Sequence, residues 1–216
     1  MYDSKSGAFF YIASNDNNDY IYHWDNTYYI RYNSKKALFA LEKLYADIDV
    51  TDSWAAAFYY HIYLDMLFNA VGLINDRFII KKEMSKELKD NITRNRKEYD
   101  FNSETYYWLS DKSFRNFIEH INSRCDKLIK NGKYHGAFNF IHPNIKQKVQ
   151  EALASNEKMQ NNLLNLINKT YVILDTTDGS ITRKVIPLDK LKQELESINE
   201  RSNVIWEFLN DKIWQG

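Results

Sequence analysis

The chain contains one cysteine, two prolines and six glycines among its 216 residues. A single cysteine excludes a disulfide scaffold and fits a reducing compartment. The scarcity of proline and glycine leaves little linker, so residues 1–216 are predicted to form a single domain. There is no apolar run of about 18 residues, as a membrane helix requires, and the first residues lack a signal-peptide pattern. We therefore expect a cytoplasmic protein with no membrane partner.

An excess of charge of one sign is also missing. The 29 basic residues balance the 29 acidic ones, whereas a dedicated duplex binder usually carries a basic excess. Locally, the segment 77–97 is basic: Arg77, Lys81, Lys82, Lys86, Lys89, Arg94, Arg96 and Lys97 stand against Glu83, Glu87 and Asp90. Two interpretations stay open for it, a surface that attracts a phosphate backbone or an ordinary solvated helix and loop.

Several common reaction centres have no counterpart in the sequence. There is no glycine-rich phosphate loop, no G-x-S-x-G and no zinc-type cysteine spacing, which disfavours nucleotide hydrolases, serine hydrolases and zinc proteins. His120, His135 and His142 have no second histidine or carboxylate at ligand spacing. We therefore expect neither a metal nor another cofactor.

The most informative segment reads Ser-Phe-Arg-Asn-Phe-Ile-Glu-His-Ile over residues 113–121. It lies in a predicted helix over 111–130, which ends near Asn131-Gly132. The helix has one apolar face at helical spacing, formed by Phe114, Phe117, Ile118, Ile121, Cys125 and Leu128. At about 100° per residue, the opposite face carries Arg115, Asn116, Glu119 and His120.

This polar face suits phosphate chemistry. A guanidinium binds phosphate oxygens with a planar set of donors, and an imidazole exchanges protons near neutral pH. Arg115 and His120 therefore predict a phosphate binder and a proton shuttle at one site. The alternative is a solvated face in which Arg115 and Glu119 form an ordinary pair four residues apart.

The string Arg115-Asn116-Phe117-Ile118-Glu119-His120 resembles the R-N-x-x-E-H signature of a bacterial subgroup of HEPN domains. That signature often continues as hydrophobic-Asp-Glu-Arg. Here Arg124 keeps the basic position, while Asn122 and Ser123 replace the two acidic ones. The resemblance implies a mainly helical bundle, to which this sequence adds a small β-hairpin near the C-terminus. Members of the family occur in toxin–antitoxin and phage-defence systems, and many are RNA endonucleases.

The resemblance also implies roles. His120 would act as general acid or base, Arg115 would neutralise charge on the phosphoryl oxygens, Asn116 would orient the ring or the phosphate, and Glu119 would hold Arg115. RNA would be cleaved without a metal, by attack of a ribose 2′-OH on the adjacent phosphate. Expected partners are RNA, a second copy joined through the motif helix, and a cognate antitoxin or defence protein. The competing hypothesis is a non-catalytic HEPN-like module that binds RNA or protein.

The N-terminal half of the chain is predicted as follows. Residues 1–32 form an irregular or short-strand lead-in, residues 34–48 a helix, and residues 54–74 a helix capped by Thr51-Asp52-Ser53. Because the second helix is apolar nearly all round, it is expected to be buried. Asp65 on it then needs a partner, either His61 one turn earlier or Arg115 or His120 of the motif.

After residue 76 we expect a loop over 77–109 with one short helix near 85–91, and then, beyond the motif helix, a further helix over 144–167. Residues 170–187 predict a β-hairpin appendage around Asp178-Gly179. Leucines and isoleucines from Leu188 to Leu209 recur at three- and four-residue steps, which predicts a last helix that is docked on the domain or forms a dimer seam.

Overall fold

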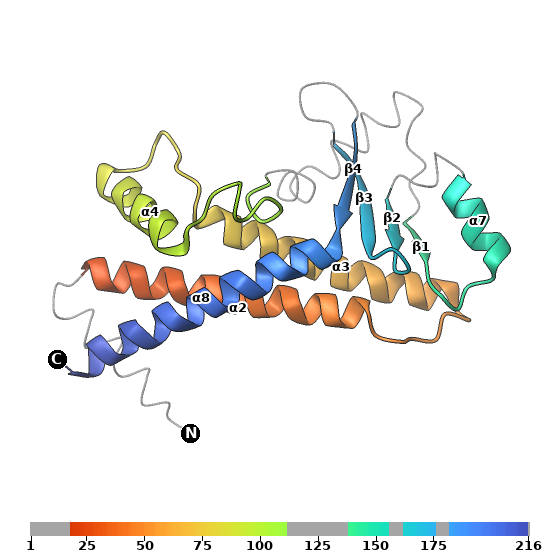
Figure 1. Ribbon diagram of the computed structural model, residues 1–216, viewed down its shortest axis with the longest axis horizontal. Helices are drawn as coiled ribbons and strands as arrows, with labels where there is room; N and C mark the ends of the chain where they lie inside the picture. Colours follow the sequence, from red (N-terminus) through yellow and green to blue (C-terminus); the bar gives the residue numbers. More distant parts are fainter. Residues whose placement is uncertain (1–17, 112–137, 156–161, 176–181, 216) are drawn as a thin grey trace.

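The computed structural model describes residues 18–111, 138–155, 162–175 and 182–215. Helices predominate in these ranges, and a small sheet precedes the last helix (Figure 1). This confirms the prediction of a mainly helical chain with β-structure towards the C-terminus. The elements are α2 (Asn18–Leu44), α3 (Ser53–Asp76), α4 (Lys86–Tyr99), β1 (Asn139–Ile141), α7 (Gln147–Ser155), β2 (Leu163–Asn165), β3 (Thr170–Asp175), β4 (Thr182–Pro187) and α8 (Leu188–Gln215).

Three long helices form the body of the molecule. α2 packs against both α3 and α8, so helices from the two ends of the described chain lie side by side (Figure 1). Their apolar residues meet in one core with side chains of the sheet, and all of the following are buried: Ile30, Leu41, Leu44, Leu64, Leu67, Val71, Leu188, Leu191 and Leu195. Burial of this much apolar surface is the main force that stabilises the fold.

The prediction for the first part of α2 is wrong. Residues 18–32 are helical and continue without a break into the helix predicted from residue 34. The aromatic residues Trp24, Tyr28 and Tyr32 alternate with polar ones, but they also recur every four residues. The helical period is the one that buries Ile30 and Asn26 against the rest of the body.

α3 begins as predicted. The Asp52 side chain accepts hydrogen bonds from the backbone N–H groups of Trp54 and Ala55, both at 3.0 Å, which satisfies donors that a helix start leaves free. The prediction that the helix is buried all round is wrong, because Trp54 and Phe58 are 86% and 71% exposed. Only the face that meets α2 and the sheet is covered, so apolar composition overestimates burial here.

α4 starts at the predicted position, with Ser85 as its cap, but it runs to Tyr99 rather than ending near residue 91. It is tied to the start of α2 through His23, which is buried. The His23 ring contacts Asn95 Oδ1 through Nδ1 at 3.0 Å and Glu98 Oε2 through Nε2 at 2.8 Å. These polar contacts hold α4, a charged helix on the surface, against the body of the molecule.

The sheet has the strand order β1-β2-β3-β4. β3 and β4 pair antiparallel with Thr170 opposite Pro187, which confirms the predicted hairpin strands, and the turn at Asp178-Gly179 lies outside the described residues. β2 pairs antiparallel with β3, and β1 pairs parallel with β2. Because Tyr171, Ile173 and Ile186 belong to the main core, the sheet packs on the helices.

The predicted helix over 144–167 is confirmed over α7 and wrong at its end. Among the described residues of this range, α7 is helical, whereas Leu163 and Leu164 lie in β2 with their side chains buried. Asn162 has a φ of 92°, a left-handed value that asparagine tolerates better than most residues and that no helix continues through. Pairing with β3 therefore overrides the local helical pattern.

None of the described helices combines the length and the apolarity needed to cross a membrane. α3 is the most apolar of them, yet its exposed face carries His61 and Asp65.

Candidate functional site

Most of the predicted site lies outside the described residues. Arg115, Asn116, Glu119, His120 and Arg124 all fall within residues 112–137, hereafter the motif segment, together with the helix predicted to carry them. Asp65 is described. The structure describes the residues on either side of the motif segment. Their positions fix the two points that the segment must connect.

The residues just before the motif segment are held by two helices. The Glu194 carboxylate of α8 accepts backbone hydrogen bonds from Trp108, at 3.0 and 3.1 Å to its two oxygens, and from Leu109, at 2.9 Å. The Asn75 side-chain amide of α3 donates to the Leu109 carbonyl at 2.8 Å. Burial raises the pKa of Glu194, while the backbone N–H groups act in the opposite direction by stabilising its charged form.

A third contact comes from the sheet. The Lys184 ammonium of β4 pairs with the Asp111 carboxylate, and it also lies 5.7 Å from the centre of the Trp108 ring. Both charged side chains are mostly buried, and burial lowers the pKa of Lys184. α8 thus holds Trp108 and Leu109, α3 holds Leu109, and β4 holds Asp111, the last described residue before the motif segment.

The chain becomes described again at Phe138, beside α3. The Phe138 ring lies 5.7 Å from the His61 ring and 6.4 Å from that of Phe140. His61 Nδ1 in turn contacts Asp65 Oδ2 at 3.0 Å, with half of one side chain and two thirds of the other exposed. Asp65 therefore has the local partner named from the sequence, but the premise that it is buried is wrong. Its supporting role toward the motif remains a prediction.

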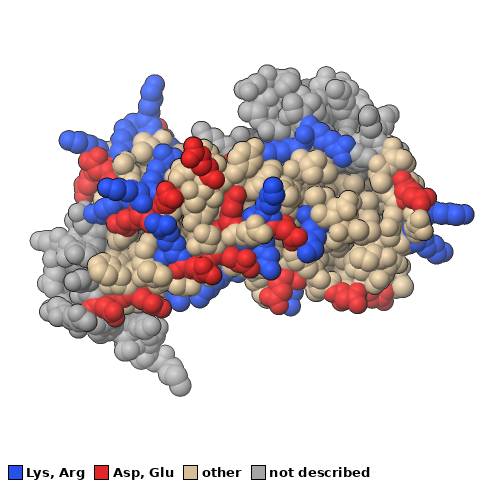
Figure 2. Space-filling view, in the orientation of Figure 1, with Lys and Arg blue, Asp and Glu red and all other residues tan. Residues whose placement is uncertain are grey.

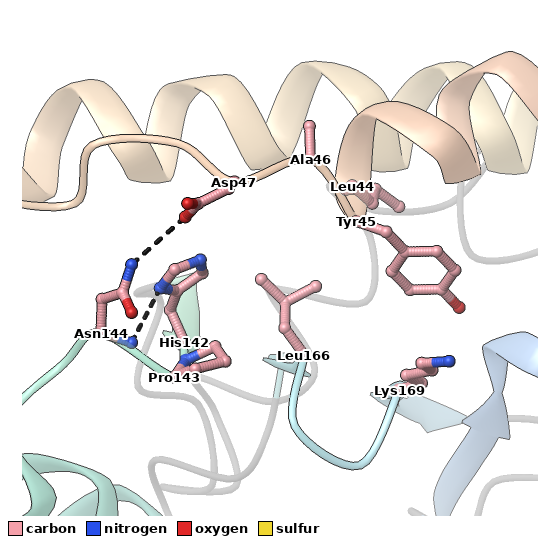
Figure 3. A pocket seen from close by; sticks show the side chains of 9 residues that line it. All are labelled: Leu44, Tyr45, Ala46, Asp47, His142, Pro143, Asn144, Leu166 and Lys169. Carbon is pink, nitrogen blue, oxygen red and sulfur yellow. Dashed lines mark hydrogen bonds between the residues drawn. The ribbon is translucent and has the colours of Figure 1, made fainter.

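A pocket of about 410 Å³ lies between the end of α2 and the turns of the sheet (Figure 3). Its lining residues are Leu44, Tyr45, Ala46, Asp47, His142, Pro143, Asn144, Leu166 and Lys169. The Asn144 amide donates to Asp47 Oδ1 at 3.2 Å across 97 positions of sequence. Such a separation explains why no sequence pattern pointed to this pocket.

His142 is the buried imidazole of the pocket. The backbone N–H of Asn144 donates to its Nδ1 at 3.1 Å, so the proton of the neutral ring sits on Nε2 (Figure 3). Burial lowers the pKa of His142, and the nearby Asp47 carboxylate only partly opposes this. The lone pair that a general base needs is occupied, so His142 acts as a hydrogen-bond donor rather than as a base.

The other polar groups of the pocket neutralise one another. Lys169 lies 3.2 Å from Asp189 and over the Tyr45 ring, and the Tyr45 hydroxyl donates to the same carboxylate at 3.2 Å. Burial raises the pKa of Tyr45, so this hydroxyl stays protonated. Within the described ranges, no group of three or more His, Cys, Asp and Glu side chains is placed to hold a metal ion. The pocket therefore offers hydrogen bonds but no acid–base pair.

We expect His142 to make the protein less stable as the pH is lowered. Its folded pKa lies below the ordinary value of about 6.5, so the unfolded chain binds more protons in the window between the two values. The free energy of unfolding therefore decreases as the pH falls through that window. Urea denaturation at pH 7 and pH 5.5 should show a smaller decrease for His142→Gln than for the wild type. His61→Gln, at an exposed histidine, is the control, and equal decreases in all three proteins would contradict the assignment.

The basic segment 77–97 is largely the surface of α4. Figure 2 shows Lys and Arg side chains gathered at the end of the molecule where α4 lies, with acidic side chains between them. An open depression of about 590 Å³ is lined here by Lys86, Glu87, Asp90, Asn91 and Arg94. Two cations and two carboxylates line it, so its charge favours neither an anion nor a cation. Such mixed charge is typical of a solvated helix surface, and attraction of a phosphate backbone to the segment remains a prediction.

No protein-family model matches the chain, and it matches neither a curated protein nor a solved structure. Its own residues and the motif they form are therefore the basis for assigning a function.

Proposed function

We propose that this protein is a metal-independent endoribonuclease of a toxin or phage-defence system, with Arg115 and His120 as its catalytic pair. The observation that carries the proposal is the string Arg115-Asn116-Phe117-Ile118-Glu119-His120. Its polar side chains, which can bind phosphate and transfer protons, fall opposite the apolar face of the predicted helix. A mainly helical body is what the HEPN resemblance implies for such a protein, and the described residues are mainly helical.

The proposed reaction needs no group from outside the chain and its substrate. The ribose 2′-OH attacks the adjacent phosphorus, the bond from phosphorus to the 5′-oxygen breaks, and the products are a 2′,3′-cyclic phosphate and a free 5′-OH. His120 takes the proton from the 2′-OH or gives one to the departing 5′-oxygen. Arg115 stabilises the negative charge that builds on the phosphoryl oxygens, and Asn116 orients the ring or the phosphate.

The contacts before the motif segment support a positioned site. Catalysis by acid–base transfer depends on reacting groups held to within a fraction of an ångström. Glu194, Asn75 and Lys184 fix the residues leading up to position 111 from three separate elements. The His61–Asp65 pair lies beside Phe138, where the segment ends. Asp65 is proposed to support the motif from there, and Arg124 from within the segment.

A second copy is part of the proposal. One Arg and one His are few for phosphoryl transfer, in which charge spreads over several oxygens. A two-fold dimer through the motif helix would supply two of each, and two-fold dimers are the commonest soluble assembly.

Cleavage should persist in EDTA and leave cyclic phosphate ends. The proposed chemistry uses only Arg115, His120 and the substrate's own 2′-OH, so chelation of divalent cations should change the rate less than twofold, an effect of about 0.4 kcal/mol on the barrier. The measurement is gel analysis of an RNA substrate with end-group identification by mass spectrometry. Loss of cleavage in EDTA with recovery in Mg²⁺ would instead indicate a metal-dependent nuclease.

One observation favours the alternative, a non-catalytic module that binds RNA or protein. Trp54, Phe58 and Ile62 recur every four residues along α3, and all three side chains are exposed. Exposed apolar rows of this kind, with no cation among them, are typical of surfaces that contact another protein rather than of reaction centres or RNA-binding surfaces. RNA that stays intact in the presence of the wild type at micromolar concentration would favour this module.

A further inference from the structure

α2 carries a second, longer row of side chains, which the proposed chemistry does not use; its middle members are exposed and its two end members are half-buried. Its members follow at steps of four, four, three, four and four residues, so they lie on one face of the helix. We call the following residues the α2 row: Trp24, Tyr28, Tyr32, Lys35, Phe39 and Lys43. From first to last the row spans 19 helical steps, about 28 Å at 1.5 Å per residue.

Three aromatic members of the row have nearly parallel rings. The rings of Trp24 and Tyr28 are 6.0 Å apart and 10° from parallel, and those of Tyr28 and Tyr32 are 6.3 Å apart and 16° from parallel. Tyr28, Tyr32 and Phe39 are 42%, 55% and 46% exposed, although burying rings of this size is favourable. Each of these three side chains thus keeps surface that a planar ligand can contact.

Positive charges alternate with these rings. Lys35 is exposed between Tyr32 and Phe39, and the Lys43 ammonium lies 5.2 Å from the centre of the Phe39 ring. Beside the row, Arg31 lies 5.5 Å from the Trp206 ring of α8 and donates to Asn203 Oδ1 at 2.6 Å. The guanidinium is therefore held in place between the two helices.

We propose that the α2 row binds single-stranded RNA, with bases stacked on Tyr28, Tyr32 and Phe39 and phosphates beside Lys35, Lys43 and Arg31. Stacking on aromatic rings along a positively charged track is how proteins bind single strands without reading their sequence. A surface for another protein would instead be depleted of lysine at its centre. This assignment presupposes RNA as the substrate of the proposed function, and it names the substrate class as single-stranded.

Binding can be measured without cleavage. A fluorescently labelled 12-nucleotide 2′-O-methyl oligo-uridine has no 2′-OH to attack, so the wild-type protein can be titrated by anisotropy. Tyr32→Ala should weaken binding roughly tenfold, since one stacked base is lost. Lys35→Ala should weaken it less and reduce the slope of log K against log salt by about 0.7, one phosphate contact on a single strand. A duplex of the same length should bind more weakly than the single strand.

Trp54→Ala is the matched control, because Trp54 is a more exposed aromatic residue on α3 and lies off the row. It should bind as the wild type does. Absence of binding by the wild type, or equal weakening by Trp54→Ala and Tyr32→Ala, would overturn the assignment. Circular dichroism checks that Tyr32→Ala is folded, and Lys35→Ala tests the row independently if it is not.

The two proposals fail separately. If the wild type binds the oligonucleotide through Tyr32 and Lys35 but cleaves no natural RNA, the row stands and the endoribonuclease does not. If natural RNA is cleaved and Tyr32→Ala and Lys35→Ala match the wild type in both binding and cleavage, the endoribonuclease stands and the row does not.

Discussion

His120→Ala is expected to reduce RNA cleavage by about 10³-fold, because general acid–base catalysis by one side chain contributes about 10²–10⁴. Arg115→Ala should cause a comparable loss, since no other group of the motif would neutralise the phosphoryl oxygens. Both residues fall opposite the apolar face of the predicted helix, so the free energy of unfolding should change by no more than about 0.5 kcal/mol. Cleavage rates on a fixed RNA and urea denaturation measure the two quantities.

Two further experiments sharpen this result. Lys127→Ala, a change in the same segment outside the motif, should leave the rate within about twofold, the effect expected of a surface substitution. Mixing inactive Arg115→Ala and His120→Ala proteins should restore part of the activity if each site takes residues from two copies. Rates of both single variants equal to that of the wild type would refute the catalytic pair, and mixing without recovery would refute the composite site.

The second large effect is expected at Glu194. Glu194→Ala removes the carboxylate that accepts hydrogen bonds from the backbone N–H groups of Trp108 and Leu109. Hydrogen bonds to a charged group are each worth about 1.5–3 kcal/mol, so the free energy of unfolding should fall by about 3 kcal/mol. Glu194→Gln should recover only part of this, because a side-chain amide keeps one of the two acceptor oxygens.

Glu196→Ala is the matched control for this prediction. Glu196 lies on the same helix, is half exposed and pairs with Lys192 at 3.5 Å, so its loss should cost a few tenths of a kcal/mol. Burial raises the pKa of Glu194, so the folded protein holds this proton more tightly than the unfolded chain does. This contribution to the free energy of unfolding decreases as the pH rises through the folded pKa. Equal losses of stability in Glu194→Ala and Glu196→Ala would show that the backbone contacts contribute little.

Where the sequence predicted structure well, the pattern was local. The strands of the hairpin over 170–187 and the helix from Leu188 follow from period and from neighbouring residues. The start of α2 was missed because alternating aromatic residues satisfied a strand pattern and a helix pattern at once. β1 and β2 have only three residues each, and pairing with partners elsewhere in the chain, not local preference, makes them strands.

The candidate site shows the same division. Arg115 and His120 could be singled out because they lie five residues apart in one helix-forming stretch. The contacts that hold the start of that stretch could not be foreseen, since Glu194 is more than eighty residues away from Trp108. The sequence was enough to name His61 as a partner of Asp65. It was not enough to predict that Asp65 is exposed, because all-round apolarity does not reveal which face of a helix stays uncovered.

The pairing of α2 with α8 makes the proposed activity depend on the order of synthesis. α8 is the last described element to leave the ribosome, yet it supplies Leu188, Leu191 and Leu195 to the core and Glu194 to the residues ahead of the motif segment. A chain that stops before Leu188 therefore contains the whole R-N-x-x-E-H string but neither a closed core nor the carboxylate that fixes its approach. Because the proposed activity destroys RNA, this dependence would delay RNA cleavage until α8 has been translated.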